Sequence, residues 1–395
     1  MNVLVVHLTH PEGYPPAFNA INCISKRVNN LTILTTDTLP TNWRYDDNVS
    51  LDLIEGEHDR FKYAKRSRFK KVKTYFEFVK RIIIHLKKSK IDLIIVYDDV
   101  PFLFYLLASF FVRKETRIWF HSHDVYPVSA YKKFSINWLA AIAVQKYFHK
   151  IHFFSLPAIE RIKMFPIGSF DGQTFFIPNY PSTNVIKRGA EIGDFKNTDK
   201  LKIAYPGSPS IKNGFEDLLK AMKDPINGRI LELYIIGESN PEYMEKLTKV
   251  AQKQGVDSQL FFVGRVPYVK MTDFIKQFHV GWAVYKPLDI SVATAGTSSN
   301  KIYEFLANGL PIIVFNNEHH HEHLGKSEVV FFTDLSLKSI QLALKGIMKD
   351  MASLQIKARN EFLASYQFEF EFNRVIGEVV SIVKKDNNSL CEKKG

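Results

Sequence analysis

Several features that define common protein classes are scarce in this chain of 395 residues. Its two cysteines, Cys23 and Cys391, lie far apart, which excludes a disulfide-stapled fold and fits a reducing cytosol. The longest uncharged, mainly apolar run covers residues 100–112 and is too short to span a membrane. Residues 1–6 lack the basic start of a signal peptide and are typical of a strand. We therefore expect a cytoplasmic protein that is soluble or bound to a membrane surface.

Acidic residues are scarce in the segment from Arg60 to Lys90, which holds thirteen Lys or Arg residues and one acid, Glu77. The spacing of four apolar residues predicts the buried stripe of a helix: Phe76, Val79, Ile83 and Leu86. The alternative, a solvated helix that only packs on its own core, leaves the one-sided positive charge unexplained. We therefore expect residues 60–90 to contact an anionic membrane surface or an acidic glycan.

Nucleic-acid binding is not expected, although the net charge is +12. The sequence contains no zinc-finger, helix-turn-helix or RNA-recognition pattern to accompany that charge.

Apolar strands alternate with helical stretches along the whole chain, which favours doubly wound parallel sheets. Strands are predicted at 3–7, 31–35, 92–97, 117–121, 150–154 and 174–179. A second series is predicted at 201–205, 231–237, 260–264, 281–285, 311–315 and 329–332. Residues 182–200 are polar and aperiodic, so we predict a first domain at 1–181, a linker at 182–200, a second domain at 201–367, and a helix with a polar tail at 368–395.

The most informative segment is residues 297–313. Thr297, Ser298 and Ser299 precede a predicted helix at 300–307, and Asn308-Gly309 ends it before a buried strand. A helix that begins in this way offers free N–H groups and about half a positive charge, which suits a diphosphate. Glu304, one turn further on, can accept hydrogen bonds from ribose hydroxyls. The alternative is an ordinary capped helix with a solvated glutamate.

Three parts of this segment resemble the nucleotide-sugar signature of the retaining group 1 glycosyltransferases (family 4-like) of the GT-B class. They are Ser299-Asn300-Lys301, Tyr303-Glu304-Phe305 and Gly309-Leu310-Pro311. The resemblance implies that Glu304 holds the donor ribose and that Thr297 to Lys301 lie along the diphosphate. Elsewhere, residues 176–181 resemble the turn that ends the first domain of this family. Residues 262–267 resemble a strand end near the nucleobase, which points to Arg265 and Val266.

The resemblance implies a GT-B fold: two Rossmann-like α/β domains facing a cleft, with a C-terminal helix that crosses back to the first domain. It also implies transfer, with retention, from a UDP- or GDP-sugar to a glycan or lipid-linked glycan of capsule, O-antigen or cell-wall assembly. No cofactor and no metal are expected, and the enzyme is expected at the inner face of the membrane. The alternatives are a sugar-nucleotide epimerase on the same scaffold and a catalytically silent glycan- or partner-binding protein.

The phosphate loop of the second domain departs from the family pattern. After Gly207, Ser208 stands where the family has an arginine and Asn213 where it has a lysine, while Lys212 is one position early. Either Lys212 reaches in from a shifted loop and Lys301 or Arg265 adds charge, or the donor is held in another way.

In the first domain, His123 followed by Asp124 best matches the family element whose histidine approaches the donor sugar, and His121 is the competing alignment. Gly13 and Tyr14 partly match a loop near the acceptor. The run from His319 to His323 is interpreted as a polar loop rather than a metal site.

Overall fold

The computed structural model describes residues 1–36, 43–54, 67–112, 116–184, 186, 199–238 and 240–392, with side chains up to 386. Two compact units emerge from the contacts: unit 1 is Met1–Pro178 with Glu369–Gly395, and unit 2 is Asn179–Phe368. Most of the predicted linker at 182–200, like part of the predicted basic segment at 60–66, lies outside the described residues.

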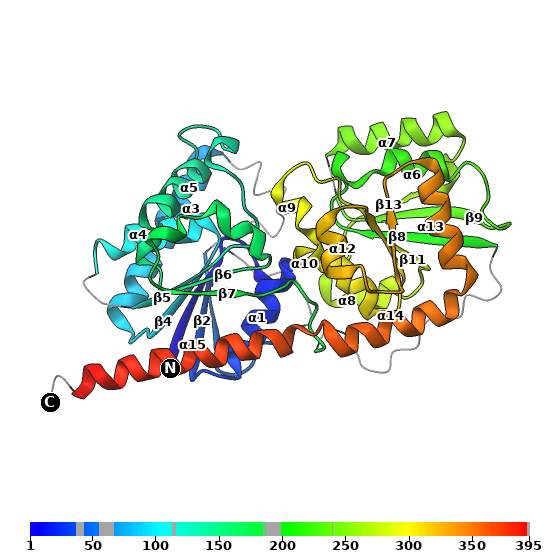
Figure 1. The fold of residues 1–395 in the computed structure, drawn as a ribbon. Coiled ribbons are helices and arrows are strands. Elements are labelled where there is room, and N and C mark those ends of the chain that lie inside the picture. The colour runs from blue at the N-terminus through cyan, green and yellow to red at the C-terminus, as the bar shows by residue number, and fades with distance from the viewer. Residues whose placement is uncertain are drawn as a thin grey trace. The chain divides into compact units, whose positions relative to one another are not determined.

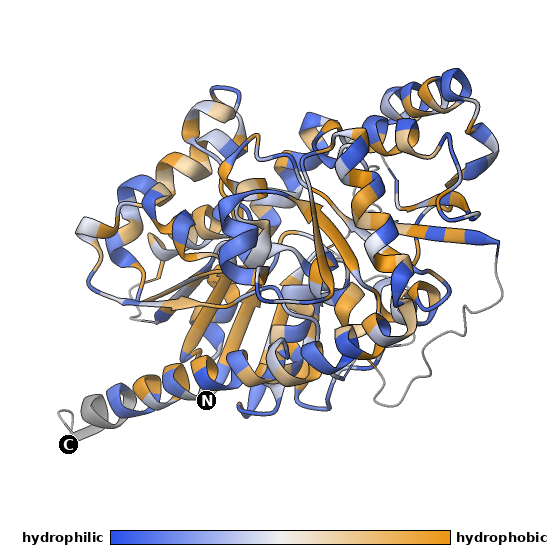
Figure 2. Ribbon diagram, turned by 45° about the vertical axis from the view of Figure 1, so that its right-hand side comes forward, coloured by the Kyte–Doolittle hydropathy of each residue, from blue (hydrophilic) through white to orange (hydrophobic). Residues whose placement is uncertain are grey.

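Unit 1 is built on a sheet of seven parallel strands in the order β3-β2-β1-β4-β5-β6-β7. Their bounds are β1 Asn2–Val6, β2 Asn30–Thr35, β3 Val49–Leu53, β4 Leu93–Tyr97, β5 Arg117–His121, β6 Phe153–Leu156 and β7 Gln173–Phe176. The inner strands are apolar runs covered on both faces (Figure 2), as parallel sheets require. Strand β3 was not predicted.

Helices cover both faces of this sheet. Figure 1 shows α3 (Arg68–Lys88), α4 (Asp99–Ser109) and α5 (Ile136–Tyr147) on one face, and α1 (Pro15–Ser25) and α15 (Phe368–Glu392) on the other. The alternation of strand side chains feeds both layers. Phe120 of β5 belongs to the core beneath α3–α5, while the neighbouring Trp119 ring stacks on Phe372 of α15 at 5.9 Å.

Helix α3 corrects one prediction. Its buried residues are Thr74, Phe78, Ile82 and Leu86. Three residues of the predicted stripe, Val79, Ile83 and Leu86, pack in or against the core, but Phe76 is 72% exposed. Phe69 and Val72 are exposed as well. With Phe76 they have the i, i+3, i+7 spacing of a single helix face. The helix therefore carries a second apolar stripe that faces solvent, among exposed lysines such as Lys70 and Lys73.

Unit 2 contains a sheet of six parallel strands in the order β10-β9-β8-β11-β12-β13. Their bounds are β8 Lys200–Pro206, β9 Ile230–Ile236, β10 Leu260–Phe262, β11 Val280–Ala283, β12 Ile312–Phe315 and β13 Val330–Thr333. Its helices are α6 Phe215–Ala221, α7 Pro241–Gln254, α8 Tyr268–Ile275, α9 Ile290–Ala293, α10 Ala295–Ser298, α11 Asn300–Ala307, α12 Glu318–Leu324, α13 Leu337–Lys349 and α14 Met351–Ser365. All six strands correspond to predicted ones.

Each sheet has one place where the strand order reverses. In unit 1 it lies between β1 and β4, and in unit 2 between β8 and β11. Open α/β sheets bind ligands beside the carboxyl ends of the strands at such a point, because the connections leave in opposite directions. A ligand site is therefore expected in the loops that follow these four strands.

The C-terminal helix α15 belongs to unit 1, although the chain reaches it from α14 of unit 2. Phe372 stacks on Trp119, and Asp386 forms an ion pair of 2.7 Å with Arg117 of β5. The predicted return of the C-terminal helix to the first domain is confirmed. Among the described residues, no helix combines the length and the apolar character that a membrane crossing requires.

Candidate functional site

Helix α11 carries the segment that the sequence singles out, and its predicted bounds are confirmed. Its Phe305 lies directly on β11, because a side chain at Gly281 would meet the Phe305 ring at 2.3 Å. The N-cap residue Ser299 makes no side-chain capping hydrogen bond. The first N–H groups of this helix thus remain available to an anion, with the positive end of the helix dipole behind them.

Glu304 is buried on this helix with 8% exposure. No hydrogen bond or ion pair engages its carboxylate within the described part of the chain, and only its backbone carbonyl is used, by Asn308. Burial raises the pKa of Glu304 to about 7, while the positive charge of Lys301 opposes that rise. The alternative of a solvated glutamate is therefore excluded. A buried acceptor without a partner is costly unless a ligand satisfies it.

Lys301 lies between two tyrosines at the strand-order reversal of unit 2. Its Nζ atom is 4.8 Å from the ring centre of Tyr205 and 5.1 Å from that of Tyr285, whose hydroxyl accepts its hydrogen bond at 2.8 Å. Burial lowers the pKa of Lys301, but the tyrosine oxygens and Glu304 outweigh burial and raise that pKa above its usual value. The ammonium group therefore stays charged.

The loop after β8 brings a glycine against this ammonium group. Gly207 has a φ of 131°, and a side chain there would meet Lys301 Cε at 2.7 Å, so the close approach requires glycine. Ser208, the next residue, is exposed, and its carbonyl accepts a hydrogen bond from the Tyr205 hydroxyl at 3.3 Å. Gly207, Ser208 and Lys301 are thus together at one edge of the sheet.

The two other departures from the family pattern have structural roles in this loop. Asn213 is buried, and its side chain contacts Ser210 and the carbonyl of Val284. Lys212 pairs with Asp289 at 2.6 Å, which fixes the loop after β8 to the loop after β11. The charge of Lys212 is consequently matched within the protein.

The residues before α11 differ from the expected open loop, because Thr297 and Ser298 belong to the short helix α10. The Ser298 hydroxyl donates to Thr294, and Ser299 shares a hydrogen bond of 3.1 Å with the Tyr285 hydroxyl. Two further polar atoms are buried without a partner among the described residues. They are the Thr297 hydroxyl and the Asn300 side-chain oxygen.

Asn179 of the predicted interdomain turn forms two hydrogen bonds with α10. Its backbone N–H donates to the Thr297 carbonyl at 3.0 Å, and its side chain donates to the Ser298 carbonyl at 2.7 Å. No role in the site was predicted for this asparagine.

Arg265 and Val266 stand apart from these residues, in the loop that follows β10. Arg265 is exposed, and Val266 packs against the core of unit 2. No hydrogen bond or ion pair joins them to α11 in the described structure.

In unit 1, His123 is held rigidly by its neighbours. Its backbone N–H donates to Asp98 Oδ1 at 2.8 Å, its Nδ1 lies 3.3 Å from Asp98 Oδ2, and its carbonyl accepts from the buried Arg161 at 2.6 Å. Its ring stacks on Tyr97 at 5.3 Å. Burial would raise the pKa of Asp98, but the charge and hydrogen bonds of His123 outweigh burial and lower it. The two residues thus form a carboxylate–imidazole pair.

Asp98 was not predicted from the sequence, but its backbone conformation is unusual. It follows β4 with a φ of 68°, a conformation that costs a non-glycine residue about 1–3 kcal/mol and tends to occur at functional sites. Tyr205, Tyr285 and Asp289 were missed as well. Tyr205 lies near the carboxyl end of β8, and Tyr285 and Asp289 follow β11. These positions are the signal that points to them.

His121 and Asp124 surround this pair. His121 ends β5 and shares a hydrogen bond of 2.7 Å with the Ser155 hydroxyl, and burial lowers its pKa well below the usual value. Asp124 is exposed. Tyr14 precedes α1, with its ring 5.0 Å from that of His7, whereas Gly13 ends a short 3-10 turn, Pro11–Gly13.

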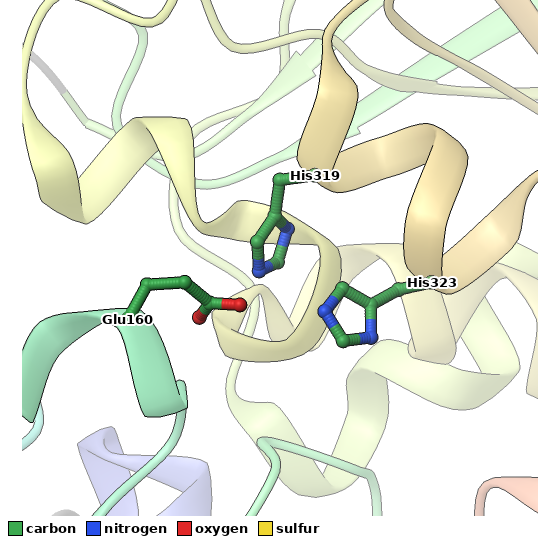
Figure 3. A group of neighbouring side chains, drawn as sticks. All are labelled: Glu160, His319 and His323. Atoms are coloured by element: carbon green, nitrogen blue, oxygen red, sulfur yellow. The ribbon is translucent and has the colours of Figure 1, made fainter.

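The histidine run is not the predicted polar loop. It forms helix α12, because the Asn317 side chain caps the N–H of His320, and both His319 and His320 are buried. His319 and His323 lie one turn apart, with ring centres 4.3 Å from each other (Figure 3). Glu160, also drawn there, belongs to unit 1. Gly296 provides space for His319, since a side chain on it would meet the imidazole at 2.6 Å.

Comparison with known proteins gives a class for this arrangement. Residues 200–350 match the family model described as "Glycosyl transferases group 1". No curated protein matches the chain in sequence.

Solved structures resemble the chain over nearly its full length. Sucrose-phosphate synthase from Thermosynechococcus elongatus superposes with a TM-score of 0.70 at 12% identity, over 97% of this chain and 100% of that one. Anabaena HepE in complex with UDP and glucose gives 0.65 at 12%, over 96% and 99%. WaaG, a glycosyltransferase involved in lipopolysaccharide biosynthesis, gives 0.65 at 11%, over 94% and 98%.

The chain therefore has the GT-B fold. Within it, the second unit carries a group 1 glycosyltransferase domain, which supports glycosyl transfer as the activity.

Proposed function

We propose that the chain transfers a sugar from a UDP- or GDP-sugar to a glycan or lipid-linked glycan acceptor, with retention of the anomeric configuration. The observation that carries this proposal is Glu304, a buried carboxylate that no described residue engages, one turn inside an uncapped helix and next to Lys301. A ribose and a diphosphate together supply the missing donors and the missing negative charge. UDP is the nucleotide bound to HepE, which favours a UDP-sugar.

In this proposal Lys301 takes the place of the basic side chains that the phosphate loop lacks. It is held charged between two tyrosines, against Gly207. Its positive charge and the first N–H groups of α11 offset the charge that develops on the departing diphosphate. No metal ion is needed for that step, so we propose a metal-free reaction. Arg265 and Val266 remain the residues proposed for the base.

His123 is the residue of unit 1 that we propose to act on the transferred sugar. The Asp98 carboxylate fixes the orientation of its imidazole, as a second group orients a histidine in many active sites.

The exposed face of α3 is the protein surface that we propose to contact a membrane. Phe69, Val72 and Phe76 project among lysines that are themselves exposed. Aromatic residues between positive charges suit the interface of an anionic bilayer. We propose that α3 holds the protein at the cytoplasmic face of a membrane that carries the acceptor.

Titration of UDP and GDP by calorimetry, with and without EDTA, tests the donor site. We expect one of them to bind, unaffected by EDTA, and Lys301→Met to weaken binding at least about tenfold through the lost charge on the diphosphate. The control is Lys253→Met on α7, also in unit 2. Absence of binding by both nucleotides would refute the proposal. Nucleotide release from the sugar nucleotide that depends on an acceptor would separate transfer from epimerisation, because an epimerase returns a sugar that still carries its nucleotide.

A further inference from the structure

Unit 1 contains a pocket of about 280 Å³ at its own strand-order reversal. The loops after β1 and β4 supply most of its walls, and α5 and the loop after β5 supply the rest. Its lining includes His7, Tyr14, Asp98, Asp99, Asp124 and Tyr131. The volume is near the lower end of the roughly 300–1,000 Å³ of small-molecule sites, so it suits one small ring.

His7 presents a hydrogen-bond acceptor to this pocket. The residue is 4% exposed, and its Nδ1 lies 2.6 Å from the carbonyl of Thr9. A carbonyl only accepts, so Nδ1 carries the proton and Nε2 keeps a lone pair. Burial lowers the pKa of His7 to about 4, an effect that the nearby His123 increases, and the ring is neutral at pH 7. No described residue takes up Nε2.

Negative charge and acceptor atoms dominate the rest of the lining. Asp98, Asp99 and Asp124 contribute carboxylates, and no lysine or arginine lines the pocket in the part of the chain that the structure describes. The positive end of α4 is already matched by Asp98 and Asp99, which stand at its N-cap and first turn, so it is not left over for an anionic ligand. A phosphate or carboxylate placed here would meet like charges without a cation to neutralise it.

The aromatic residues provide the other half of a sugar site. Tyr14, Tyr97, Tyr126 and Tyr131 line the pocket, and a tyrosine offers an apolar ring for the C–H face of a sugar with a hydroxyl at its edge. Hydroxyl groups of a sugar can donate to His7 Nε2 and to the carboxylates.

We infer that this pocket binds an uncharged, hydroxyl-rich glycosyl residue and discriminates against phosphorylated and acidic sugars. If the proposed function holds, that residue is the acceptor, and the inference narrows its chemical class. A metal ion is a poor alternative ligand for this pocket, because two of its three carboxylates are unsuited to coordinate one. Asp98 is engaged by His123, and burial, followed by the charge of Asp98, raises the pKa of Asp99 to about 7.

Saturation-transfer NMR on the full chain tests the inference with three probes: methyl β-glucoside, glucose 6-phosphate and glucuronate. We expect transfer to methyl β-glucoside and at least about tenfold weaker binding of the two anions. Tyr131→Ala should abolish the signal of methyl β-glucoside. Asp124→Lys, at an exposed rim position, should bring the affinity for glucose 6-phosphate to within about threefold of that for methyl β-glucoside.

Asp171→Lys is the matched control, because Asp171 is exposed in the same unit and does not line the pocket. It should leave all three probes unchanged. Equal binding of glucose 6-phosphate and methyl β-glucoside by the unaltered chain, or Tyr131→Ala without effect, would overturn the inference. UDP and GDP titrated in the same samples separate the two proposals. Nucleotide binding without saccharide binding refutes this inference alone, and the reverse refutes the proposed donor site alone.

Discussion

At the residue scale, the decisive property of Glu304 is that no described residue forms a hydrogen bond or ion pair with its buried carboxylate. A carboxylate buried to this extent normally has a hydrogen-bonded partner, and here Lys301 alone moderates the effect of burial on its pKa. The cost of keeping it charged is met when a ligand donates to it. Ligand binding and ionisation of Glu304 are therefore coupled.

That coupling predicts a pH dependence of nucleotide binding. The pKa of Glu304 is raised to about 7, so the ionised acceptor is the minor form below pH 7 and the major form above it. If ribose donates to the ionised form, affinity measured by calorimetry should increase about tenfold between pH 6 and pH 8 and then level off. Stronger binding at pH 6 would contradict the assignment.

Glu304→Gln is the control for titration of the nucleotide's own phosphates. The amide keeps the shape of the side chain but does not titrate, so the variant should bind more weakly and lose the part of the pH dependence that belongs to Glu304. The free energy of unfolding should change by less than about 1.5 kcal/mol, because the substitution conserves volume.

At the element scale, α3 has one buried face and one exposed apolar face. The face with Phe78, Ile82 and Leu86 packs against the sheet of unit 1, and the face with Phe69 and Phe76 is exposed. An exposed aromatic stripe is unfavourable in water alone, which supports the proposal that a membrane surface covers it.

The membrane role of α3 predicts a specific loss. Phe69→Ser and Phe76→Ser combined with Lys70→Gln and Lys73→Gln should reduce partitioning onto vesicles of phosphatidylserine and phosphatidylcholine at least about thirtyfold. The reason is that each lysine near an anionic surface contributes about 1 kcal/mol and the rings add more. Sedimentation with vesicles measures this change.

A matched set on α13 provides the control: Leu337→Ser, Leu342→Ser, Lys338→Gln and Lys345→Gln. It removes the same number of exposed apolar residues and charges in unit 2 and should leave partitioning unchanged. Equal losses in both sets would mean that net charge alone drives binding.

The sequence predicts elements well where an apolar run has one interpretation, and poorly where two faces compete. All strands except β3 were predicted, and β3 was missed because V-S-L-D-L is a half-exposed edge strand. Phe76 was placed in the wrong stripe, since spacing alone cannot tell which of two apolar faces meets the core. In α12 the six polar residues of E-H-H-H-E-H concealed a capped helix.

The site shows the same division. The segment at 297–313 predicts Glu304 and Lys301, because local spacing defines their helix. Tyr205 and Tyr285 belong to other strand ends of unit 2, and only the pairing of those strands brings them to Lys301. In unit 1, the pairing of β4 with β5 likewise brings Asp98 to His123.

At the scale of the whole molecule, unit 1 depends on residues that follow unit 2 in the chain. Phe372→Ala should destabilise unit 1 by about 3–5 kcal/mol, because it removes a ring that is 2% exposed and stacks on Trp119. Hydrogen exchange measured by mass spectrometry should show faster exchange in Met1–Pro178, with unit 2 unaffected. Phe370→Ala, at an 80% exposed position of the same helix, should change neither; uniform acceleration across both units would contradict this division.

The position of α15 also imposes an order on biosynthesis. After Pro178 is made, about 190 residues of unit 2 must be translated before the ribosome reaches Glu369, which takes about 10–40 s at bacterial and eukaryotic elongation rates. Throughout that interval the nascent first half lacks its closing helix and leaves the Trp119 ring uncovered. Until Glu369 and the residues after it have been translated, unit 1 exposes apolar surface of the kind that chaperones protect.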